Sequence, residues 1–185
     1  MRLNLGCGHD HMDGYLNVDK EAGCCPDKIQ DLENFPWDFR NDSVDYIVLS
    51  HVLEHLGSTT DSYLSIMQEL YRICKADAKI DVRVPHPRHD DFLTDPTHIR
   101  PILPGQFEMY SKKNNKVWRE QGVANTPLGD YLNIDFEVND VTWVPDDKWM
   151  SQLQNGKITS SELAYKADHE FNIIKEVKIQ LRVIK

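Results

Sequence analysis

Short apolar segments in the first half of the chain predict the strands of a parallel sheet. Two of them lie at residues 2–6 and 15–19, and a short third strand is predicted at 28–32. Residues 44–50 predict a fourth strand, and its continuous apolar run from Tyr46 to Leu49 is typical of a central strand buried on both faces. Residues 78–84 predict a fifth strand. The carboxyl ends of parallel strands lie along one edge of a sheet, so we expect four of these ends to meet at one crevice.

The segments between these strands predict unequal amounts of helix. Only residues 9–14 separate the first two strands. A parallel crossover normally needs about a dozen residues, so we expect the first helix to be missing or reduced to one turn. Residues 51–56 predict one or two helical turns. A longer amphipathic helix is predicted from Ser58, where Ser-x-x-Asp61 resembles a capping box, to about residue 74.

Residues 85–127 differ in character from the segments before them. The first part of this stretch is rich in proline and histidine, and it also contains large aromatic residues. Long irregular segments inside compact domains are usually functional or disordered, and the aromatic residues favour order. We therefore expect an ordered lid or substrate-side insert.

The last third of the chain predicts an antiparallel strand pair. Leu132, Ile134, Phe136 and Val138 alternate with polar residues, as do the apolar residues of 177–183, with helix and loop expected at 146–168. Two long closing strands suit an antiparallel edge on a parallel sheet. The predicted fold class is therefore α/β: a Rossmann-like, doubly wound, mostly parallel sheet with an antiparallel C-terminal strand pair, in a single domain over residues 1–185.

Composition narrows the class of partner. The chain has 185 residues, of which 40% are hydrophobic, and a net charge of −9. This charge opposes binding to nucleic acid or to an anionic membrane. No segment approaches the ~20 apolar residues of a membrane span, and the N-terminus enters a strand pattern without the features of a secretion signal. We expect a cytoplasmic protein with reduced cysteines.

The ends of the first three predicted strands carry the elements of a nucleoside site. Gly6-x-Gly8 follows the first strand, Asp19 ends the second, and Asp31-Leu32 closes the third. Glycines let the backbone approach a ligand, and an acid at the end of the second strand can accept hydrogen bonds from ribose hydroxyls. The loop at 9–13 offers acids and almost no helix, whereas a pyrophosphate requires the N-terminus of a full helix. The pattern therefore disfavours a dinucleotide.

These motifs resemble the class I S-adenosylmethionine-dependent methyltransferases. The resemblance rests on Leu-Asn-Leu-Gly-Cys-Gly at 3–8, Asn-Val-Asp at 17–19, Asp31-Leu32, the run at 45–56 that ends Ser-His-Val-Leu-Glu-His-Leu, and Leu-Tyr-Arg-Ile-Cys-Lys at 70–75. It covers residues 1–85 well. Many members have an acid in place of Asn4, a third glycine in place of Asp10 and a full helix after the glycines. The chain is therefore similar to a compact branch of the family with a shortened first helix.

The resemblance implies S-adenosylmethionine as the cofactor and assigns residues to it. Asp19 would hold the ribose hydroxyls, Asp31 would meet the adenine amino group, and Leu32 would lie beside the ring. The other cofactor-binding residues that the resemblance implies belong to the glycine loop and to the end of the fourth strand: Asn4, Leu5, Gly6, Cys7, Gly8, Ser50 and His51.

The acceptor of the methyl group is expected to be a small molecule or a sugar-like compound, methylated on oxygen or nitrogen. His98 and His86 are the candidate bases in the proline-rich segment, and His51 is a third candidate beside the methyl donor. Arg100 could hold an acceptor carboxylate or phosphate. Tyr110 could line the acceptor pocket or belong to a small core beneath a long loop.

Two alternative functions remain open at this stage. A metal-dependent hydrolase would use His9, His11 and Asp13, or His86, His89 and His98, although no bound metal is expected. A non-catalytic subunit would bind the cofactor without turnover.

The missing first helix also bears on assembly. Its absence would expose an apolar sheet face, so either residues 85–127 or a second subunit should cover that face, and we favour a homodimer.

Overall fold

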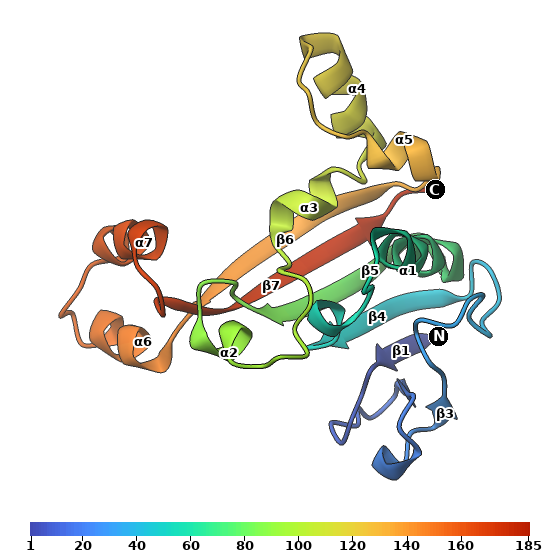
Figure 1. The fold of residues 1–185 in the computed structure, drawn as a ribbon, viewed down its shortest axis with the longest axis horizontal. Helices are drawn as coiled ribbons and strands as arrows, with labels where there is room; N and C mark the ends of the chain where they lie inside the picture. The colour runs from blue at the N-terminus through green and yellow to red at the C-terminus, as the bar shows by residue number, and fades with distance from the viewer.

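The computed structural model describes residues 1–185 and contains one seven-stranded sheet with the order β3-β2-β1-β4-β5-β7-β6 (Figure 1). Strands β1 to β5 are parallel, and β7 lies antiparallel between β5 and β6. The strands are β1 (Arg2–Leu5), β2 (Leu16–Asp19), β3 (Lys28–Ile29), β4 (Val44–Ser50), β5 (Cys74–Pro85), β6 (Phe136–Pro145) and β7 (Ile174–Val183). This arrangement confirms the predicted fold class.

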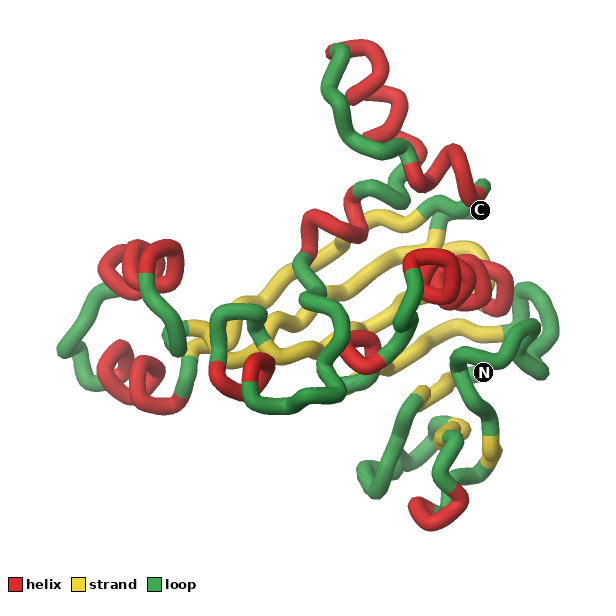
Figure 2. Tube along the Cα trace, in the orientation of Figure 1, coloured by secondary structure: helices red, strands yellow, loops and turns green.

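The longest helix is α1, which has 14 residues, and the other helices are shorter (Figure 2). No helix lies between β1 and β2, as the short connection predicted. None of the helices has the length and apolar character needed to cross a lipid bilayer. They are η1 (Ala22–Cys24), η2 (Leu53–His55), α1 (Thr60–Ile73), α2 (Asp90–Leu93), α3 (Pro104–Glu108), α4 (Lys112–Gln121), α5 (Leu128–Leu132), α6 (Asp147–Gln154) and α7 (Ser160–His169).

Several predicted element boundaries are wrong: β3 ends at Ile29 and not at residue 32, and β5 begins at Cys74 and not at residue 78. Helix α1 is capped by Thr59, whose side chain accepts a hydrogen bond from the backbone N–H of Ser62, and not by Ser58. The strand predicted from Leu132 begins only at Phe136. Leu132 instead ends α5, because Asn133 adopts a left-handed conformation with φ of 52° that terminates the helix.

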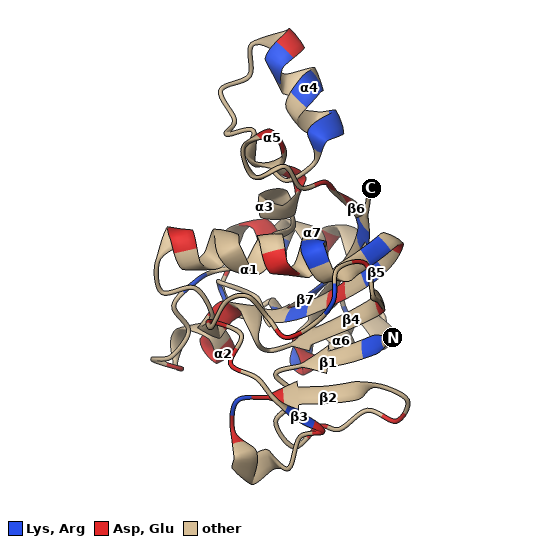
Figure 3. Ribbon diagram, turned by 90° about the vertical axis from the view of Figure 1, so that its right-hand side faces the viewer, with Lys and Arg blue, Asp and Glu red and all other residues tan.

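The core fills one face of the sheet. Apolar residues from β1, β4, β5 and β7 alternate onto this face, and α1 packs against it with Tyr63, Ile66, Met67 and Leu70. In Figure 3, α1, α2 and α3 lie on the same side of the sheet. Helices α6 and α7 lie beyond the edge of the sheet where β6 ends and β7 begins, and α4 extends away from the sheet (Figure 1).

The opposite face of the sheet, which we call the open face, is polar and has no helical cover. The register places six residues of β5 and β7 on it: Lys79, Asp81, Arg83, Lys178, Gln180 and Arg182. Lys79, Arg83 and Lys178 are exposed. A doubly wound sheet normally has helices on both faces, and here only one face has them. On β1 and β2 the register places Arg2, Asn4 and Asn17 on this face. These polar residues stand where the missing first helix led us to expect an apolar patch.

The loop between β1 and β2 takes the place of the missing first helix over the start of the open face. The side-chain amide of Asn4 donates hydrogen bonds to the backbone oxygen of Asp10 and to Oδ1 of Asn17, at 2.8 and 3.0 Å. Oδ1 of Asn17 also accepts the backbone N–H of Met12. These buried amides therefore fix the loop on the first two strands.

Tyr46 of β4 predicts a loss of stability at alkaline pH. Burial, together with a hydrogen bond to Asp81, raises its pKa to about 12. The unfolded pKa is about 10, so this stabilisation is complete below pH 10 and is lost as the pH rises toward 12. We expect the free energy of unfolding to fall more steeply between about pH 10 and 12 in the wild type than in Tyr46→Phe. Urea titrations at several pH values test this, and equal slopes would contradict it.

Candidate functional site

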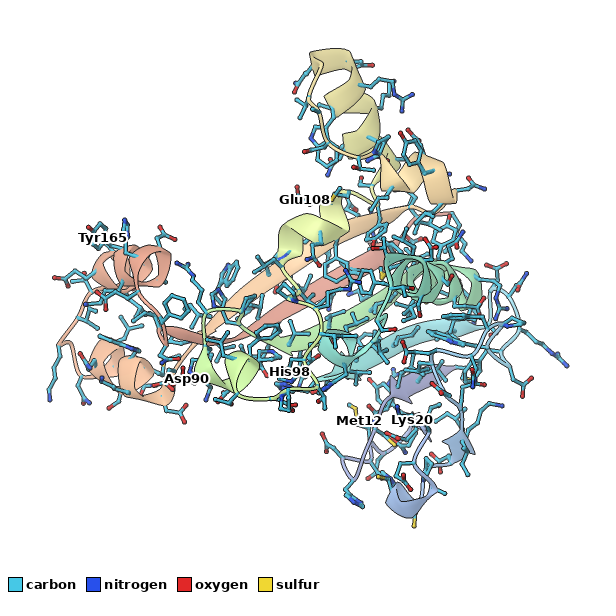
Figure 4. All side chains as sticks on the ribbon, viewed as in Figure 1. Met12, Lys20, Asp90, His98, Glu108 and Tyr165 are labelled. Atoms are coloured by element: carbon cyan, nitrogen blue, oxygen red, sulfur yellow. The ribbon has the colours of Figure 1, made fainter.

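A cavity of about 190 Å³ lies at the carboxyl ends of β1, β2 and β4. This is the edge at which ligands bind in open α/β sheets. Five residues predicted from the sequence line it together: Gly6, Asp19, Asp31, Leu32 and His51. The remaining lining residues are Lys20, Gln30, Val52, His55 and Leu56. Lys20, which lines this cavity, and His98, which is discussed below, can be located in Figure 4.

Gly6 and Gly8, in the loop after β1, differ in the space that surrounds them. Gly6 has φ of +68°, and a Cβ at this position would lie 2.5 Å from Cγ2 of Val52. Gly8 also has a positive φ, but no atom lies within 4 Å of where its Cβ would be. Gly6 therefore allows Val52 to pack closely, whereas the space beside Gly8 is open to a ligand.

The carboxylate of Asp19 is held at the end of β2 by backbone amides. Oδ2 accepts a hydrogen bond from Gly8 at 2.8 Å, and Oδ1 accepts one from Glu21 at 2.9 Å. Asp31 is fixed in a similar way by the N–H of Glu33. Each carboxylate oxygen has about two acceptor positions, so both Asp19 oxygens retain one for a ligand.

Several predicted cofactor residues do not line this cavity. Leu5 belongs to the core, and Cys7 is buried beside it, where burial raises the pKa of its thiol. The side chain of Asn4 fixes the loop that follows β1. Ser50 is half-buried at the end of β4.

His51 lies between two carboxylates. Its Nδ1 is 3.5 Å from Oε1 of Glu54, and its Nε2 is 3.1 Å from Oε2 of Glu176 at the start of β7. Glu54 and Glu176 together raise the pKa of His51, with the Glu54 interaction the larger cause. The residue has φ of 56°, a strained conformation for a side chain other than glycine or asparagine.

His98 and Arg100 lie close to the turn that follows β4. The backbone N–H groups of Ile99 and Arg100 both donate to the backbone oxygen of Glu54. The rings of His55 and His98 have their centres 4.6 Å apart. The guanidinium of Arg100 donates to the backbone oxygen of Gly57. The structure therefore brings His98 next to a residue of the cavity.

His86 and Tyr110 lie elsewhere. His86 lines a second cavity of about 370 Å³ between the end of β5, β6 and α7, and burial lowers its pKa. Tyr110 is 2% exposed and packs edge-on against Phe136 in the core. Of the two interpretations of Tyr110, the geometry is that of a core residue.

Neither histidine cluster of the hydrolase alternative is assembled. His11 contacts the backbone oxygen of Cys24, and Asp13 is exposed. The one group of three metal-ligand residues that converges is Glu54, His55 and His98, with one ligand atom from each within 4.8 Å of the others. Glu54 and His55 are adjacent in the run at 45–56, but no sequence pattern connects them with His98.

Comparison with known proteins gives a clear result for the fold and none for the sequence. No protein-family model matches the chain, and no curated protein sequence matches it. Among solved structures, a SAM-dependent methyltransferase from Archaeoglobus fulgidus is similar with a TM-score of 0.65 and 15% identity, over 98% of this chain and 85% of that one. An S-adenosylmethionine-dependent methyltransferase from Mesorhizobium loti is similar with a TM-score of 0.52 and 15% identity, over 98% and 89%.

A [4+2]-cyclase, SpnF, also shares the fold, with a TM-score of 0.54 and 12% identity over 99% of this chain and 75% of that one. The fold therefore accommodates more than one reaction. The match to many methyltransferases extends over nearly the whole chain. The chain has the fold of the class I S-adenosylmethionine-dependent methyltransferases.

Proposed function

We propose that the protein is an S-adenosylmethionine-dependent methyltransferase that acts on an oxygen or nitrogen of a small-molecule or sugar-like acceptor. One observation supports this most strongly. The cavity at the ends of β1, β2 and β4 combines the residues of a nucleoside site, with Asp19 and Asp31 as acceptors and Leu32 as an apolar wall.

The residues present fit this cofactor. The free acceptor positions of Asp19 suit the two ribose hydroxyls, and Asp31 suits the adenine amino group, with the ring against Leu32. The open space beside Gly8 gives room for the methionyl part. No arginine or lysine other than Lys20 lines the cavity, which favours a ligand without phosphates over a dinucleotide.

The bound cofactor supplies a methyl group on a positively charged sulfur, which leaves as a neutral thioether when the acceptor's lone pair forms the new bond to carbon. In this proposal the chain holds the acceptor in line with the methyl and takes the proton that the acceptor loses. His51 is our first candidate for the proton because it lines the cavity, and His98 is the second. His86 serves only an acceptor that reaches the second cavity.

The test is calorimetric titration with S-adenosylhomocysteine. We expect saturable binding and a higher melting temperature, because a ligand that binds only the folded state stabilises it. An unchanged melting temperature at saturating concentration would contradict the proposal. Binding followed by no turnover on a broad set of acceptors would favour the non-catalytic alternative.

Asp19→Ala is expected to weaken S-adenosylhomocysteine binding by about 1–3 kcal/mol, because the ribose hydroxyls lose a charged acceptor. Asp13→Ala is the matched control, since Asp13 is an exposed acid of the neighbouring loop. Circular dichroism checks that both variants fold, because Asp19 also holds two backbone amides. Equal affinity in the two variants would show that the ribose binds elsewhere.

A further inference from the structure

Glu54 carries a buried carboxylate without a hydrogen-bond partner. Its side chain is fully buried, and neither Oε1 nor Oε2 has a partner. The contact with Nδ1 of His51, at 3.5 Å, is at the long end of the hydrogen-bond range. Buried charges in proteins are normally paired, hydrogen-bonded or bound to a metal, because their desolvation is expensive. The long contact with His51 reaches only Oε1, so this carboxylate has room for a further partner, above all at Oε2.

The hydrogen bonds of His55 fix its ring with a lone pair on Nε2. The hydroxyl of Thr97 donates its only hydrogen to Oδ1 of Asp95, at 2.6 Å. The contact of 3.0 Å between Thr97 Oγ1 and Nδ1 of His55 must then be donated by the histidine. His55 is therefore the tautomer that leaves Nε2 unprotonated.

His98 is fixed in the same tautomer. Its Nδ1 lies 2.9 Å from the backbone oxygen of Phe92, which can only accept, so Nδ1 is the donor. Its Nε2 faces Oδ2 of Asp95 at 3.7 Å, which is beyond hydrogen-bond distance, so Nε2 keeps its lone pair. The ring also stacks on that of Phe92. A histidine whose second nitrogen is hydrogen-bonded to a backbone carbonyl or carboxylate is the usual arrangement of a metal ligand.

We propose that Glu54, His55 and His98 form a binding site for a divalent transition-metal ion such as Zn²⁺ or Mn²⁺. The three residues each have a ligand atom within 4.8 Å of the others. They come from two segments, which are tied together by the hydrogen bonds of Ile99 and Arg100 to the backbone oxygen of Glu54. Two imidazoles and one carboxylate favour such an ion over Mg²⁺ or Ca²⁺, which prefer oxygen ligands only.

The position of the site suggests what the ion does. His55 also lines the cavity at the ends of β1, β2 and β4. Three protein ligands leave coordination positions open for water or for another oxygen. If the proposed function holds, these positions are available to an acceptor that presents a hydroxyl or carboxylate oxygen beside the methyl donor. A His98 that binds the ion has no lone pair left, so His51 then remains as the candidate for the acceptor's proton.

The experiment is a titration of the full-length protein, stripped of metal with EDTA and dialysed, with ZnCl₂ and separately with MnCl₂ in a calorimeter. We expect one equivalent to bind to the wild type, and binding at least about 100-fold weaker in Glu54→Gln and in His98→Asn. The double variant His9→Asn/His11→Asn is the control, because these residues form the competing histidine loop. It should bind the ion as the wild type does.

The outcomes separate clearly. The absence of saturable binding in the wild type would overturn the proposal, as would binding that disappears in the His9/His11 control and persists in Glu54→Gln. Since Glu54→Gln removes a buried charge, we expect this variant to fold. Should it fail to fold, pulsed electron paramagnetic resonance of Mn²⁺ on the wild type provides a second measurement, with coupling to two imidazole nitrogens expected and no nitrogen coupling as the contrary result.

The titration contains no S-adenosylmethionine, so it tests the metal site alone. Titration of S-adenosylhomocysteine in the presence of EDTA tests the proposed function alone. The failure of one therefore does not depend on the failure of the other.

Discussion

Replacing Gly6 with alanine is expected to lower the free energy of unfolding by about 2–5 kcal/mol, the sum of overpacking and of a left-handed backbone conformation. The new Cβ would lie 2.5 and 2.8 Å from the two methyl groups of Val52. Val52 is buried and lines the cavity, so it cannot move without changing the cavity wall. We therefore expect S-adenosylhomocysteine binding to be lost as well, which calorimetry and chemical denaturation measure.

Gly14→Ala is the matched control for this change. Gly14 has a φ of +78°, but no atom lies within 4 Å of the position of its Cβ. It should therefore cost only the conformational part, about 1–2 kcal/mol, and leave binding intact. Adding Val52→Ala to Gly6→Ala should recover part of the lost stability. Equal losses in the two glycine variants would show that the contact with Val52 is unimportant.

Arg72→Ala is expected to destabilise the protein by about 2–3 kcal/mol, because it leaves a largely buried carboxylate and several carbonyl groups without a partner. Arg72 of α1 forms an ion pair with Glu69, and it donates to the backbone oxygens of Trp37 and Phe39. Glu69 in turn accepts the backbone N–H of Trp37. Burial opposes ionisation of Glu69, but these hydrogen bonds outweigh it and lower its pKa.

The control for Arg72 is Arg119→Ala. Arg119 forms an ion pair with Asp130, but its side chain is 66% exposed. Exposed pairs contribute about 0–1 kcal/mol, so this variant should be close to the wild type. Urea denaturation measures the free energy of unfolding of the two variants. A similar loss of stability in both would show that the contacts of Arg72 with Glu69, Trp37 and Phe39 contribute no more than an exposed ion pair does.

The positions of the parallel strands along the chain could be predicted because each strand has a local apolar pattern and a polar residue at its end. The absence of the first helix followed from the length of the connection between the first two strands, because residues 9–14 are too few for a helical crossover. The start of β6 could not be predicted in this way. Leu132 and Ile134 fit a strand period, but a turn at Asn133 and the close approach of Gly129 to the backbone of Tyr110 favour a short helix.

The open face was predictable from the alternation of apolar and polar residues in β5 taken together with that already noted in β7. In β5, Lys79, Asp81 and Arg83 alternate with apolar residues, and the same strict alternation continues in β7. A central strand covered by helices on both faces has a continuous apolar sequence instead. This alternation therefore indicated that one layer of helices is absent.

The site was predictable only in part. Gly6, Asp19, Asp31 and Leu32 belong to segments with a known geometric relation, because neighbouring parallel strands end at one edge. His98 reaches Glu54 through a long irregular segment, so their proximity depends on tertiary contacts that no local pattern encodes. The same holds for Tyr110, whose core position is decided by its packing on Phe136.

The open face also affects how the stability of the protein depends on temperature. The heat capacity change of unfolding is set mainly by the apolar surface that becomes hydrated. On the open face the side chains are already in contact with water in the folded state, so unfolding hydrates less apolar surface there than in a sheet covered on both sides. We expect a heat capacity change below the usual value of about 12–15 cal/mol/K per residue. The stability curve is then flatter, and the protein loses stability slowly on cooling as well as on warming.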